Sequence, residues 1–482
     1  MNRRSLIGSL TAALLVLSTH AAAATSAQTM VDRWAKSKAL RGLTIGLSVV
    51  DSVSGRVFAE LNANTVLNPA SGTKLLTTAA ALHTLPREPS WTTSAHGVIQ
   101  GAALAGPLRL VGKGDPKLLI AHLEKMADDL SAQGLTRIDE GLILHTGHFD
   151  DEHLPPAYEQ KKTDAGYRPA VGALAANFGA VRINVKPGKR IGKPVRVSVE
   201  GGKHAVSLVV SATTGKGKIK KLTIKASEHQ DGRTEFRVSG TLGIKASAVA
   251  VRKRIHDPDL WTGHVFASLL RARGIMLGTP LRMTQDALPE DAGPALSTIR
   301  PRSLPETLAD INIWSNNFMA EMVLKQMGCT NASACSWKHG VKRVTEVLQR
   351  LGLPEGSFNF INGSGLYKAT RISAKAMTTL LVAMKTDPAR AGAFEGGLAV
   401  SGKSGTLRSR MVNKALRNRV KAKTGTLDEV VSLSGYLSPR AGRGHTLAFA
   451  IFVNGATPKR TARIRRKIDT LLRRLTRASL QR

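Results

Sequence analysis

Residues 71–74 form a Ser-x-x-Lys motif, the only one in the chain, at the start of an apolar, helix-like run over residues 75–82. Residues three apart lie on one face of a helix, with Cβ atoms about 5–6 Å apart. Lys74 could therefore accept the proton of the Ser71 hydroxyl and convert a weak alcohol into a nucleophile. The turn at residues 68–70 would place the serine at the helix N-terminus, where backbone N–H groups favour developing negative charge. The alternative is a capping serine followed by a solvated lysine.

Two more short motifs follow further along the chain. A Ser-x-Asn triplet at residues 315–317 stands at the start of an expected helix over residues 314–327, and a Lys-Thr-Gly triplet at residues 423–425 precedes a strand-like run. Each has a second copy, because Ser-x-Asn recurs at residues 357–359 in an expected loop and residues 403–407 repeat Lys-x-Gly-Thr-Leu. Sequence context must choose between the copies.

The segments that follow the two Lys-x-Gly copies differ. Residues 430–437 and 446–454 have the apolar, β-branched composition that predicts a hairpin, and they follow the copy that begins at Lys423. The first strand of this hairpin could lie beside the nucleophile helix. The earlier copy is followed by residues 408–411, Arg-Ser-Arg-Met, which are not strand-like. The context therefore favours the copy at Lys423.

The order Ser-x-x-Lys, Ser-x-Asn, Lys-Thr-Gly is typical of the penicilloyl serine transferases, which are penicillin-binding proteins and serine β-lactamases. More closely, the chain resembles the D-alanyl-D-alanine carboxypeptidase/endopeptidases with a large insertion, the class C low-molecular-mass penicillin-binding proteins. About 240 residues separate Ser71 from Ser315, which fits the nested extra domains of that family. The resemblance covers nearly the whole mature chain and is carried by residues 68–82, 112–118, 315–317, 362–366, 405–407 with Arg410, and 422–427.

The resemblance implies an acyl-enzyme mechanism. Ser71 would attack the carbonyl of the D-Ala-D-Ala peptide bond, and Lys74 would act as base with its pKa lowered by the positive charge of Lys423. Ser315 would relay the proton to the leaving D-Ala amine, and water would then hydrolyse the acyl-enzyme. β-Lactams would be covalent inhibitors, and neither a cofactor nor a metal is expected.

The resemblance also implies the substrate contacts. Asn317 would hydrogen-bond the substrate backbone amide, and Lys423 and Thr424 would hold the terminal carboxylate, with Gly425 completing the motif. The backbone N–H groups of the nucleophile and of Thr426 would form an oxyanion hole, in which each donor is worth about 3–4 kcal/mol.

Three positions depart from the family pattern. Asn362 stands where the family usually has Asp, and Tyr-Lys at residues 367–368 replaces a Ser-Arg pair. Residues 155–159, which precede Tyr167, lack the Trp common in that stretch. These positions lie around the family's pocket for the substrate side chain, so the preference for the donor peptide does not carry over, whereas the acylation machinery does.

The N-terminus predicts export. Arg3 and Arg4 precede an apolar stretch at residues 6–17, and the alanines at residues 21–24 offer cleavage sites, so residues 1–24 are predicted to be a signal peptide. The apolar stretch is too short to span a bilayer, and no later segment is long and apolar enough. The mature protein is expected in the periplasm, soluble or peripherally associated with the envelope.

The formal net charge of +36 is extreme. Nucleic acid is the first partner such a charge suggests, but the cations are spread along the chain and aromatic residues make up only 4%. Because stacking side chains are scarce, no nucleic-acid partner is expected. Anionic envelope polymers, cell-wall peptides or lipid headgroups fit an exported basic protein better. The sequence does not predict the oligomeric state.

Two smaller clusters could also carry chemistry. Cys329 and Cys335 are the only cysteines and flank a short loop, so a local disulfide is expected, with two free thiols as the alternative. The segment 145–153 holds three histidines and three acidic residues of types that suit zinc. Its spacing fits no metalloprotease pattern, so a polar surface turn is favoured.

Together these patterns predict an α/β (α+β) multi-domain protein. A transpeptidase-like domain, with an antiparallel sheet flanked by helices, is expected from residues 25–87 and 300–482. It is interrupted by an insertion over residues 88–180 and 251–299 that contains an antiparallel β module at residues 181–250. The closing helix, from about residue 461, is expected to pack on its own sheet, although a basic amphipathic helix can also lie on a membrane. Its apolar face carries Ile464, Ile468, Leu471, Leu472 and Leu475.

The predicted function is hydrolysis of D-Ala-D-Ala ends of peptidoglycan stem peptides, of peptide cross-links, or of both. A β-lactamase or penicilloyl-serine esterase is the alternative enzyme, but no Glu-x-x-Leu-Asn deacylation motif occurs. A non-catalytic peptidoglycan-binding protein is the third hypothesis, and it is disfavoured because the motifs are intact.

Overall fold

The computed structural model describes residues 26–330, 333–368, 370–439 and 445–478. The chain forms two compact units, one of Met1–Arg87, Leu304–Asn316 and Val341–Arg482, the other of Glu88–Ser303 and Asn317–Gly340. Residues 317–340 thus group with the second unit, although the sequence analysis assigned them to the transpeptidase-like domain. The predicted signal peptide, residues 1–24, lies outside the described residues.

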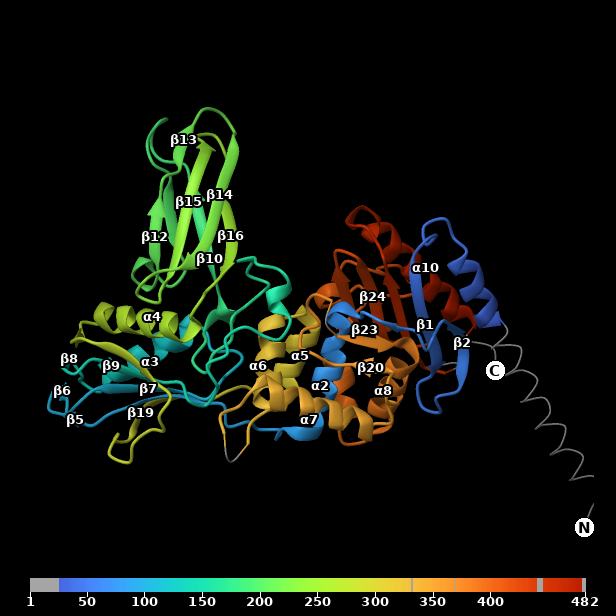
Figure 1. Cartoon of the computed structure of the whole chain (residues 1–482), viewed down its shortest axis with the longest axis horizontal. Coiled ribbons are helices and arrows are strands. Elements are labelled where there is room, and N and C mark those ends of the chain that lie inside the picture. The colour runs from blue at the N-terminus through green and yellow to red at the C-terminus, as the bar shows by residue number, and fades with distance from the viewer. Residues whose placement is uncertain (1–25, 331–332, 369, 440–444, 479–482) are drawn as a thin grey trace, which may run out of the picture. The chain divides into compact units, whose positions relative to one another are not determined.

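The first unit is built on a six-stranded antiparallel sheet with helices on both faces (Figure 1). β24 is buried along its whole length, so both faces of the sheet must be covered. In spatial order its strands are β2 (Val57–Leu61), β1 (Thr44–Asp51), β25 (Leu447–Asn454), β24 (Val430–Leu437), β23 (Val420–Leu427) and β22 (Ala399–Val400).

One face of this sheet is covered by α10 (Thr461–Ala478) and by a helix over residues 26–35. The five apolar residues predicted for the core face of the closing helix are all fully buried, packed with Leu47, Phe449 and their neighbours. The prediction that this helix packs on its own sheet is therefore confirmed. Within the described residues, none of the helices has the length and apolar character needed to cross a membrane.

The opposite face of the sheet packs against α8 (Ala374–Thr386). The hydroxyls of Ser48 and Thr378 are hydrogen-bonded to each other, and the Tyr436 hydroxyl donates to a backbone carbonyl of α8. Successive side chains of a strand point to opposite faces. Ala422 of β23 belongs to the core under α10. By alternation along the strand, Lys423 and Gly425 therefore face the opposite side of the sheet, the side of α8.

The other elements of this unit lie outside the six-stranded sheet. They are β3 (Val66–Leu67), α2 (Thr73–Thr84), α5 (Leu304–Trp314), β20 (Phe358–Asn359), β21 (Arg371–Ser373) and α9 (Ala391–Gly396), and α7 (Trp337–Arg350) begins in the second unit and ends in the first.

The second unit contains a five-stranded sheet with a buried face and a polar face. The buried face contributes Leu108, Leu110, Leu142 and Leu144 to a core shared with α3 (Ile120–Ala132) and α4 (Pro258–Ala272). The strand order is β18 (Leu281–Thr284), β9 (Leu142–His145), β7 (Leu108–Gly112), β4 (Thr93–His96) and β19 (Ala295–Ile299). A smaller sheet is formed by β17 (Met276–Leu277), β8 (Arg137–Ile138), β6 (Ala103–Leu104) and β5 (Ile99–Gln100), and α6 (Asn317–Gln326) completes the unit.

A β module occupies the stretch where the sequence analysis expected one (Figure 1). It holds two sheets rather than one wholly antiparallel set, because β12 and β13 each pair in parallel with β15. Alternating short strands do not encode which neighbour they pair with, so this part of the prediction was wrong. The strands are β10 (Ala180–Lys186), β11 (Arg196–Val199), β12 (Ser207–Val210), β13 (Thr213–Gly215), β14 (Lys220–Glu228), β15 (Thr234–Gly243) and β16 (Val249–Arg254).

Candidate active site

Ser71 and Lys74 are brought together at the start of α2. Ser71 lies in a 3-10 turn, Ala70–Gly72, immediately before the helix, and the Lys74 Nζ donates a hydrogen bond to Ser71 Oγ at 3.1 Å. The Lys74 side chain is fully buried, and its Nζ also donates to the backbone carbonyl of Ser364 at 2.7 Å. Gly72 is the N-cap residue, and no side chain caps the helix. The alternative of a capping serine with a solvated lysine therefore does not describe this site.

The turn that precedes the serine is held by Asn68. Its Oδ1 accepts the Ala70 N–H at 2.7 Å, and its Nδ2 donates to the Tyr367 carbonyl at 2.8 Å. Asn454, at the end of β25, exchanges two hydrogen bonds of 3.1 Å with the backbone of Asn68. Ala70 is thereby kept at a φ of 48°, a left-handed conformation that alanine rarely adopts. Strain of this kind persists only where surrounding contacts enforce it.

A glycine-rich loop, residues 362–366, presses against the same turn. Asn362 Oδ1 accepts the Gly365 N–H at 2.9 Å, so the loop carries the Ser364 carbonyl to Lys74. Gly365 has a φ of 72°, and a Cβ there would lie 2.0 Å from the Ala70 carbonyl oxygen. Asn362 is fully buried. The Asp-to-Asn departure noted in the sequence therefore falls on a residue that shapes the loop, and not on an exposed pocket wall.

Ser315 lies between two helices, which corrects the prediction of one helix over residues 314–327. α5 ends at Trp314 and α6 begins at Asn317, and Ser315 has a left-handed φ of 59°. Its Oγ accepts a hydrogen bond from Lys423 Nζ at 2.7 Å. The break turns the serine hydroxyl toward the strand that carries the Lys-Thr-Gly motif. The second Ser-x-Asn copy, in contrast, contributes β20 to a small three-stranded sheet.

Lys423 is fully buried in β23. Its Nζ also donates to the Thr424 carbonyl at 2.9 Å. Burial, and secondarily the charge of Lys74, lower the pKa of Lys423 well below its ordinary value of 10.5. An amine in this environment exchanges its proton readily with a hydroxyl at hydrogen-bond distance.

Gly425 allows β23 to approach the nucleophile turn. A Cβ at this position would lie 2.1 Å from Ser432 Oγ and 2.4 Å from the Pro69 carbonyl oxygen. The Ser432 hydroxyl donates to that same carbonyl at 2.6 Å. A side chain at residue 425 would therefore push the strand away from Ser71. This is a physical reason for glycine as the third member of the motif.

Thr424 and Thr426 lie next to groups that the sequence analysis did not assign. The Thr424 hydroxyl donates to Thr406 Oγ1 at 2.9 Å, so the earlier Lys-x-Gly copy lies beside the real one. Arg465 of α10 donates from Nη2 to Thr426 Oγ1 at 2.7 Å. Burial lowers the pKa of Arg465, with a further contribution from Arg410.

Arg465 escaped the sequence analysis because the contact joins two segments 39 positions apart, and only the apolar stripe of the helix was considered. The related Arg410 was noted in the sequence only as part of the family resemblance. In the structure Arg410 is held by Asp469 of α10 at 2.5 Å.

Asn317 is placed differently from the other predicted site residues. Ser71, Lys74, Ser315 and residues 423–426 belong to the first unit, and Asn317 belongs to the second. Its Nδ2 donates to the backbone carbonyl of Tyr167 at 2.7 Å. The Tyr167 side chain is 58% exposed. The amide of Asn317 is thus oriented by the loop that carries Tyr167.

Cys329 and Cys335 are joined by a disulfide in the second unit. His148 lies next to it, with Nε2 3.5 Å from Cys335 Sγ and 3.0 Å from Gln326 Oε1. Burial lowers the pKa of His148. In the part of the chain that the structure describes, these three residues form the one cluster with metal-ligand types in range. The disulfide leaves no thiolate for a metal, so the cluster is not a metal centre in this state.

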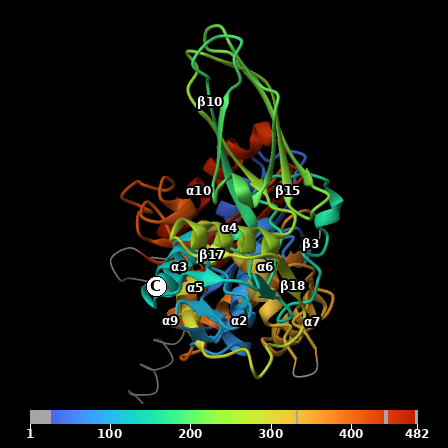
Figure 2. The same cartoon turned by 90° about the vertical axis from the view of Figure 1, so that its left-hand side faces the viewer.

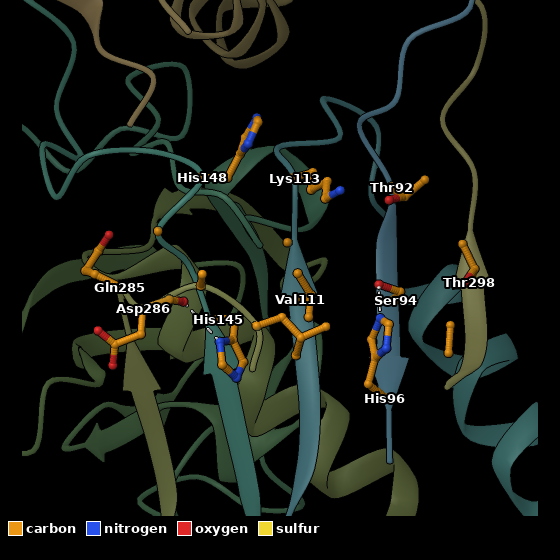
Figure 3. Close-up of a pocket in the computed structure, with 15 residues that line it drawn as sticks. Thr92, Ser94, His96, Val111, Lys113, His145, His148, Gln285, Asp286 and Thr298 are labelled. Atoms are coloured by element: carbon orange, nitrogen blue, oxygen red, sulfur yellow. Dashed lines mark hydrogen bonds between the residues drawn. The ribbon is translucent and has the colours of Figure 1, made fainter. Parts of the chain in front are cut away.

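A polar cavity of about 590 Å³ lies on the second unit's five-stranded sheet, and Figure 3 shows its lining. His145 is 4% exposed, with Nδ1 3.2 Å from the Asp286 carbonyl and Nε2 3.4 Å from Arg109. The expectation that this histidine lies in a surface turn was therefore wrong. His96 pairs with Ser94 Oγ at 2.9 Å on β4, which is separated from β9 by β7. Burial lowers the pKa of His145, which keeps it a neutral hydrogen-bonding residue.

The comparison with known families covers nearly the whole described chain. Residues 27–475 match the D-Ala-D-Ala carboxypeptidase 3 (S13) family. The chain belongs to this family. The contacts of Lys74 with Ser71 and of Lys423 with Ser315 are compatible with a serine hydrolase. The family match therefore agrees with the geometry of the site and with the resemblance found in the sequence.

Named members of the family share much of this chain. The D-alanyl-D-alanine carboxypeptidase of Actinomadura sp. (strain R39) is 30% identical over 441 residues, which is 88% of this chain and 80% of that protein. The D-alanyl-D-alanine carboxypeptidase DacB of Haemophilus influenzae is 24% identical and covers 86% of each chain. The S13 carboxypeptidase described here is therefore an enzyme of the serine hydrolase class.

Solved structures share the fold of this S13 carboxypeptidase. Penicillin binding protein 4 (dacB) from Haemophilus influenzae aligns with a TM-score of 0.79 and 21% identity, over 92% of this chain and 98% of that chain. A predatory endopeptidase from Bdellovibrio bacteriovorus aligns with a TM-score of 0.52 and 13% identity, over 89% and 94% of the two chains. The predicted fold class is thereby confirmed.

Proposed function

We propose that this chain is a penicillin-sensitive D-Ala-D-Ala carboxypeptidase in which Ser71 is the nucleophile and Lys74 the general base. The observation that carries the proposal is the Lys74–Ser71 hydrogen bond of 3.1 Å, made by a lysine that is fully buried. One of the Lys74 protons is committed to the Ser364 carbonyl, which helps to hold the nitrogen beside the serine. A base within hydrogen-bond reach of the hydroxyl is the first requirement of such catalysis.

Acylation follows from these contacts. Burial and the nearby charge of Lys74 lower the pKa of Lys423, and two amines this close favour a neutral form at one of them, which could accept a proton. The Ser71 Oγ forms a bond to the carbonyl carbon of the penultimate D-Ala while its proton passes to Lys74. Backbone N–H groups of Ser71 and Thr426 stabilise the oxyanion, and loss of one such donor costs about 3–4 kcal/mol.

Release of the terminal D-Ala needs a proton at its nitrogen. Ser315 supplies it as the C–N bond breaks, and Lys423, 2.7 Å from the Ser315 hydroxyl, restores it. Water then attacks the acyl carbon, with its proton passing back through the same groups, and Ser71 is regenerated. Every proton transfer in this scheme runs between groups of the first unit.

Substrate recognition uses the edge of β23 and the side chains above it. Among the described residues β22 pairs with β23 only through Ala422 and Lys421, so the edge beyond Lys423 can add a substrate backbone as a further strand. Thr424, Thr426 and Arg465 offer two hydroxyls and a guanidinium to the terminal carboxylate. A guanidinium suits a carboxylate because its paired donors match both oxygens.

We place Asn317 and Gly425 in supporting roles. Asn317 would hydrogen-bond the substrate amide from its position beside Tyr167, and Gly425 keeps β23 close to the nucleophile turn. The substrates proposed are peptidoglycan stem peptides, and cross-links in addition, since the relatives include proteins named as carboxypeptidases and structural neighbours named as endopeptidases. We propose a periplasmic location, on the strength of the sequence pattern of residues 1–24.

The deciding experiment is labelling with a fluorescent penicillin, followed by digestion of purified sacculi. The wild-type protein is expected to form a covalent adduct and to release D-Ala, and Ser71→Ala to do neither. An adduct that persists in Ser71→Ala would overturn the assignment of the nucleophile. Steady turnover of nitrocefin would instead identify a β-lactamase, and sacculus binding without acylation a non-catalytic protein. Counting released D-Ala against cleaved cross-links separates carboxypeptidase from endopeptidase activity.

A further inference from the structure

The far end of the β module is made of three loops that lie together. These tip loops are residues 187–195, 216–219 and 244–248, each joining two strands of the module. Strand pairing brings the three to one end, and backbone hydrogen bonds link them. Lys245 N–H donates to the Gly217 carbonyl at 2.8 Å and so joins two of the loops, and Thr214 N–H of β13 donates to the Lys193 carbonyl of the third at 2.8 Å. Figures 1 and 2 show the β module in two views.

The tip loops carry only positive charge. Their sequences contain no Asp or Glu. Six cations are exposed on them: Lys189, Arg190, Lys193, Lys216, Lys218 and Lys245. None of the six lies within ion-pair distance of a carboxylate in the described part of the chain.

Some cations elsewhere in the module are paired. Arg233 contacts Asp231 at 2.7 Å, Arg237 contacts Glu235 at 2.8 Å, and Lys253 contacts Asp164 at 2.6 Å. Two of these pairs lie at the start of β15, which is the opposite end of that strand from the tip loops. These parts of the module therefore offset some of their positive charge with carboxylates, whereas the tip loops contain no acidic residue.

Each tip loop also exposes an isoleucine. Ile191 is 52% exposed, Ile219 is 43% exposed and Ile244 is 37% exposed. Isoleucine is among the residue types most often buried in proteins. A single exposed aliphatic side chain needs no explanation, but one on each of three loops at the same end of the module, each loop also carrying exposed cations, places apolar and basic side chains together there.

We propose that the tip loops dock this protein on an anionic phospholipid bilayer. The lysines and Arg190 would bind lipid phosphates, and the three isoleucines would enter the boundary between headgroups and acyl chains. Basic residues attract a protein to anionic lipid, each lysine near the surface strengthening binding about five-fold. Apolar side chains inserted about 5–10 Å give the second contribution that stable attachment needs.

The isoleucines decide between a bilayer and a soluble polyanion. A polymer of carboxylates or phosphates would satisfy the cations and offer nothing to the aliphatic side chains. Only a surface with both a charged layer and an apolar layer engages all three loops. The docking surface shares no residue with the Ser71 site, so its loss and the loss of catalysis are separate outcomes.

The experiment is co-sedimentation of the full-length mature protein with vesicles of phosphatidylglycerol and phosphatidylethanolamine. Vesicles of phosphatidylcholine alone serve as the neutral reference. We expect the protein to sediment with the anionic vesicles and to be released as salt is raised. The triple variant Ile191→Ser, Ile219→Ser, Ile244→Ser is expected to bind at least ten-fold more weakly, with penicillin labelling unchanged.

A charge variant and two matched controls complete the design. Lys189→Gln, Lys193→Gln and Lys218→Gln together are expected to weaken binding about a hundred-fold. The same change at three exposed lysines of the first unit is expected to have a much smaller effect, as is Arg473→Gln with Arg474→Gln on α10. The three control lysines are Lys342, Lys375 and Lys459.

Two results would overturn the proposal. The first is wild-type vesicle binding by the isoleucine variant together with loss of binding in the lysine variant, because a polyanion site would behave in this way. The second is loss of binding in the α10 variant and not in either tip variant, which would assign the membrane contact to the closing helix.

Discussion

Lysines in two regions of this molecule are used in opposite ways. Lys74 and Lys423 are fully buried beside serine hydroxyls, and burial lowers the pKa of Lys423. The tip-loop lysines are exposed and have no carboxylate partner among the residues that the structure describes. We propose that the same side chain acts as a proton carrier where water is excluded, whereas it is a surface charge where water is present. The net charge of +36 therefore says little about function until each lysine is placed.

The largest expected effect comes from removing a buried lysine. Lys74→Gln keeps the length of the side chain and a hydrogen-bond donor but cannot accept the Ser71 proton. Loss of a general base costs about 10²–10⁴-fold in rate, so the second-order rate constant for penicillin acylation should fall by that factor. Stopped-flow labelling measures it. The control is Lys403→Gln in the earlier motif copy, where the side chain is exposed. Its labelling rate should stay within about two-fold of the wild type, because substitutions at exposed positions usually have effects of no more than about 0.5 kcal/mol. Equal losses in both variants would break the comparison.

Arg465 is the next test, because it is the cation that the sequence did not reveal. Arg465→Gln removes a charged donor from Thr426, and hydrogen bonds to charged groups are worth about 1.5–3 kcal/mol. We expect KM for a D-Ala-D-Ala peptide to rise about ten-fold or more with kcat little changed. Arg466→Gln, one position along the same helix and exposed, is the matched control. A fall in kcat at constant KM would show that Arg465 does not bind the carboxylate.

The pH profile sharpens the comparison through Lys423. Because its pKa is lowered, its ammonium form is lost at a pH well below 10.5 as pH rises. If that ammonium is needed, either to return the proton to Ser315 or to hold the substrate carboxylate as the sequence predicted, kcat/KM should fall on the alkaline side in this range. Lys423→Arg keeps its charge at all working pH values, so the alkaline limb should move to higher pH even if the maximum rate drops. An unmoved limb would assign the titration to another group.

The smallest effect on labelling is expected from removing the disulfide, because it involves neither the buried lysines nor the tip-loop lysines. The bond closes a loop with a sequence separation of 6. Chain-entropy arguments give about 2 kcal/mol for a loop of that size. Cys329→Ser with Cys335→Ser should lower the thermal midpoint by about 4–8 °C for a domain of 150–250 residues, and leave penicillin labelling intact. Loss of labelling would instead link this loop to the site.

The sequence was sufficient where function depends on local spacing. Ser71 and Lys74 are one helical turn apart, so a short motif placed them together. The sequence put the Lys-Thr-Gly triplet before the strand at residues 430–437, whereas in the structure the triplet itself lies within a strand, β23. The sequence was insufficient where long-range contacts override local preference. The left-handed break at Ser315 interrupts a sequence that favours one continuous helix. The guanidinium of Arg465 and the burial of Asn362 depend on segments that only the tertiary fold brings together.

The pairing of β1 with β25 has a consequence for biosynthesis. Thr44 lies opposite Asn454, so the first of the strands to be synthesised is hydrogen-bonded to the last. Contacts that close so long a loop form late. The Asn68–Asn454 bonds that fix the nucleophile turn belong to the same late step. A nascent or truncated chain that ends before Leu447 has the Ser-x-x-Lys motif but lacks the strand that holds the preceding turn. We therefore expect the chain to be inactive until nearly all of it has been synthesised.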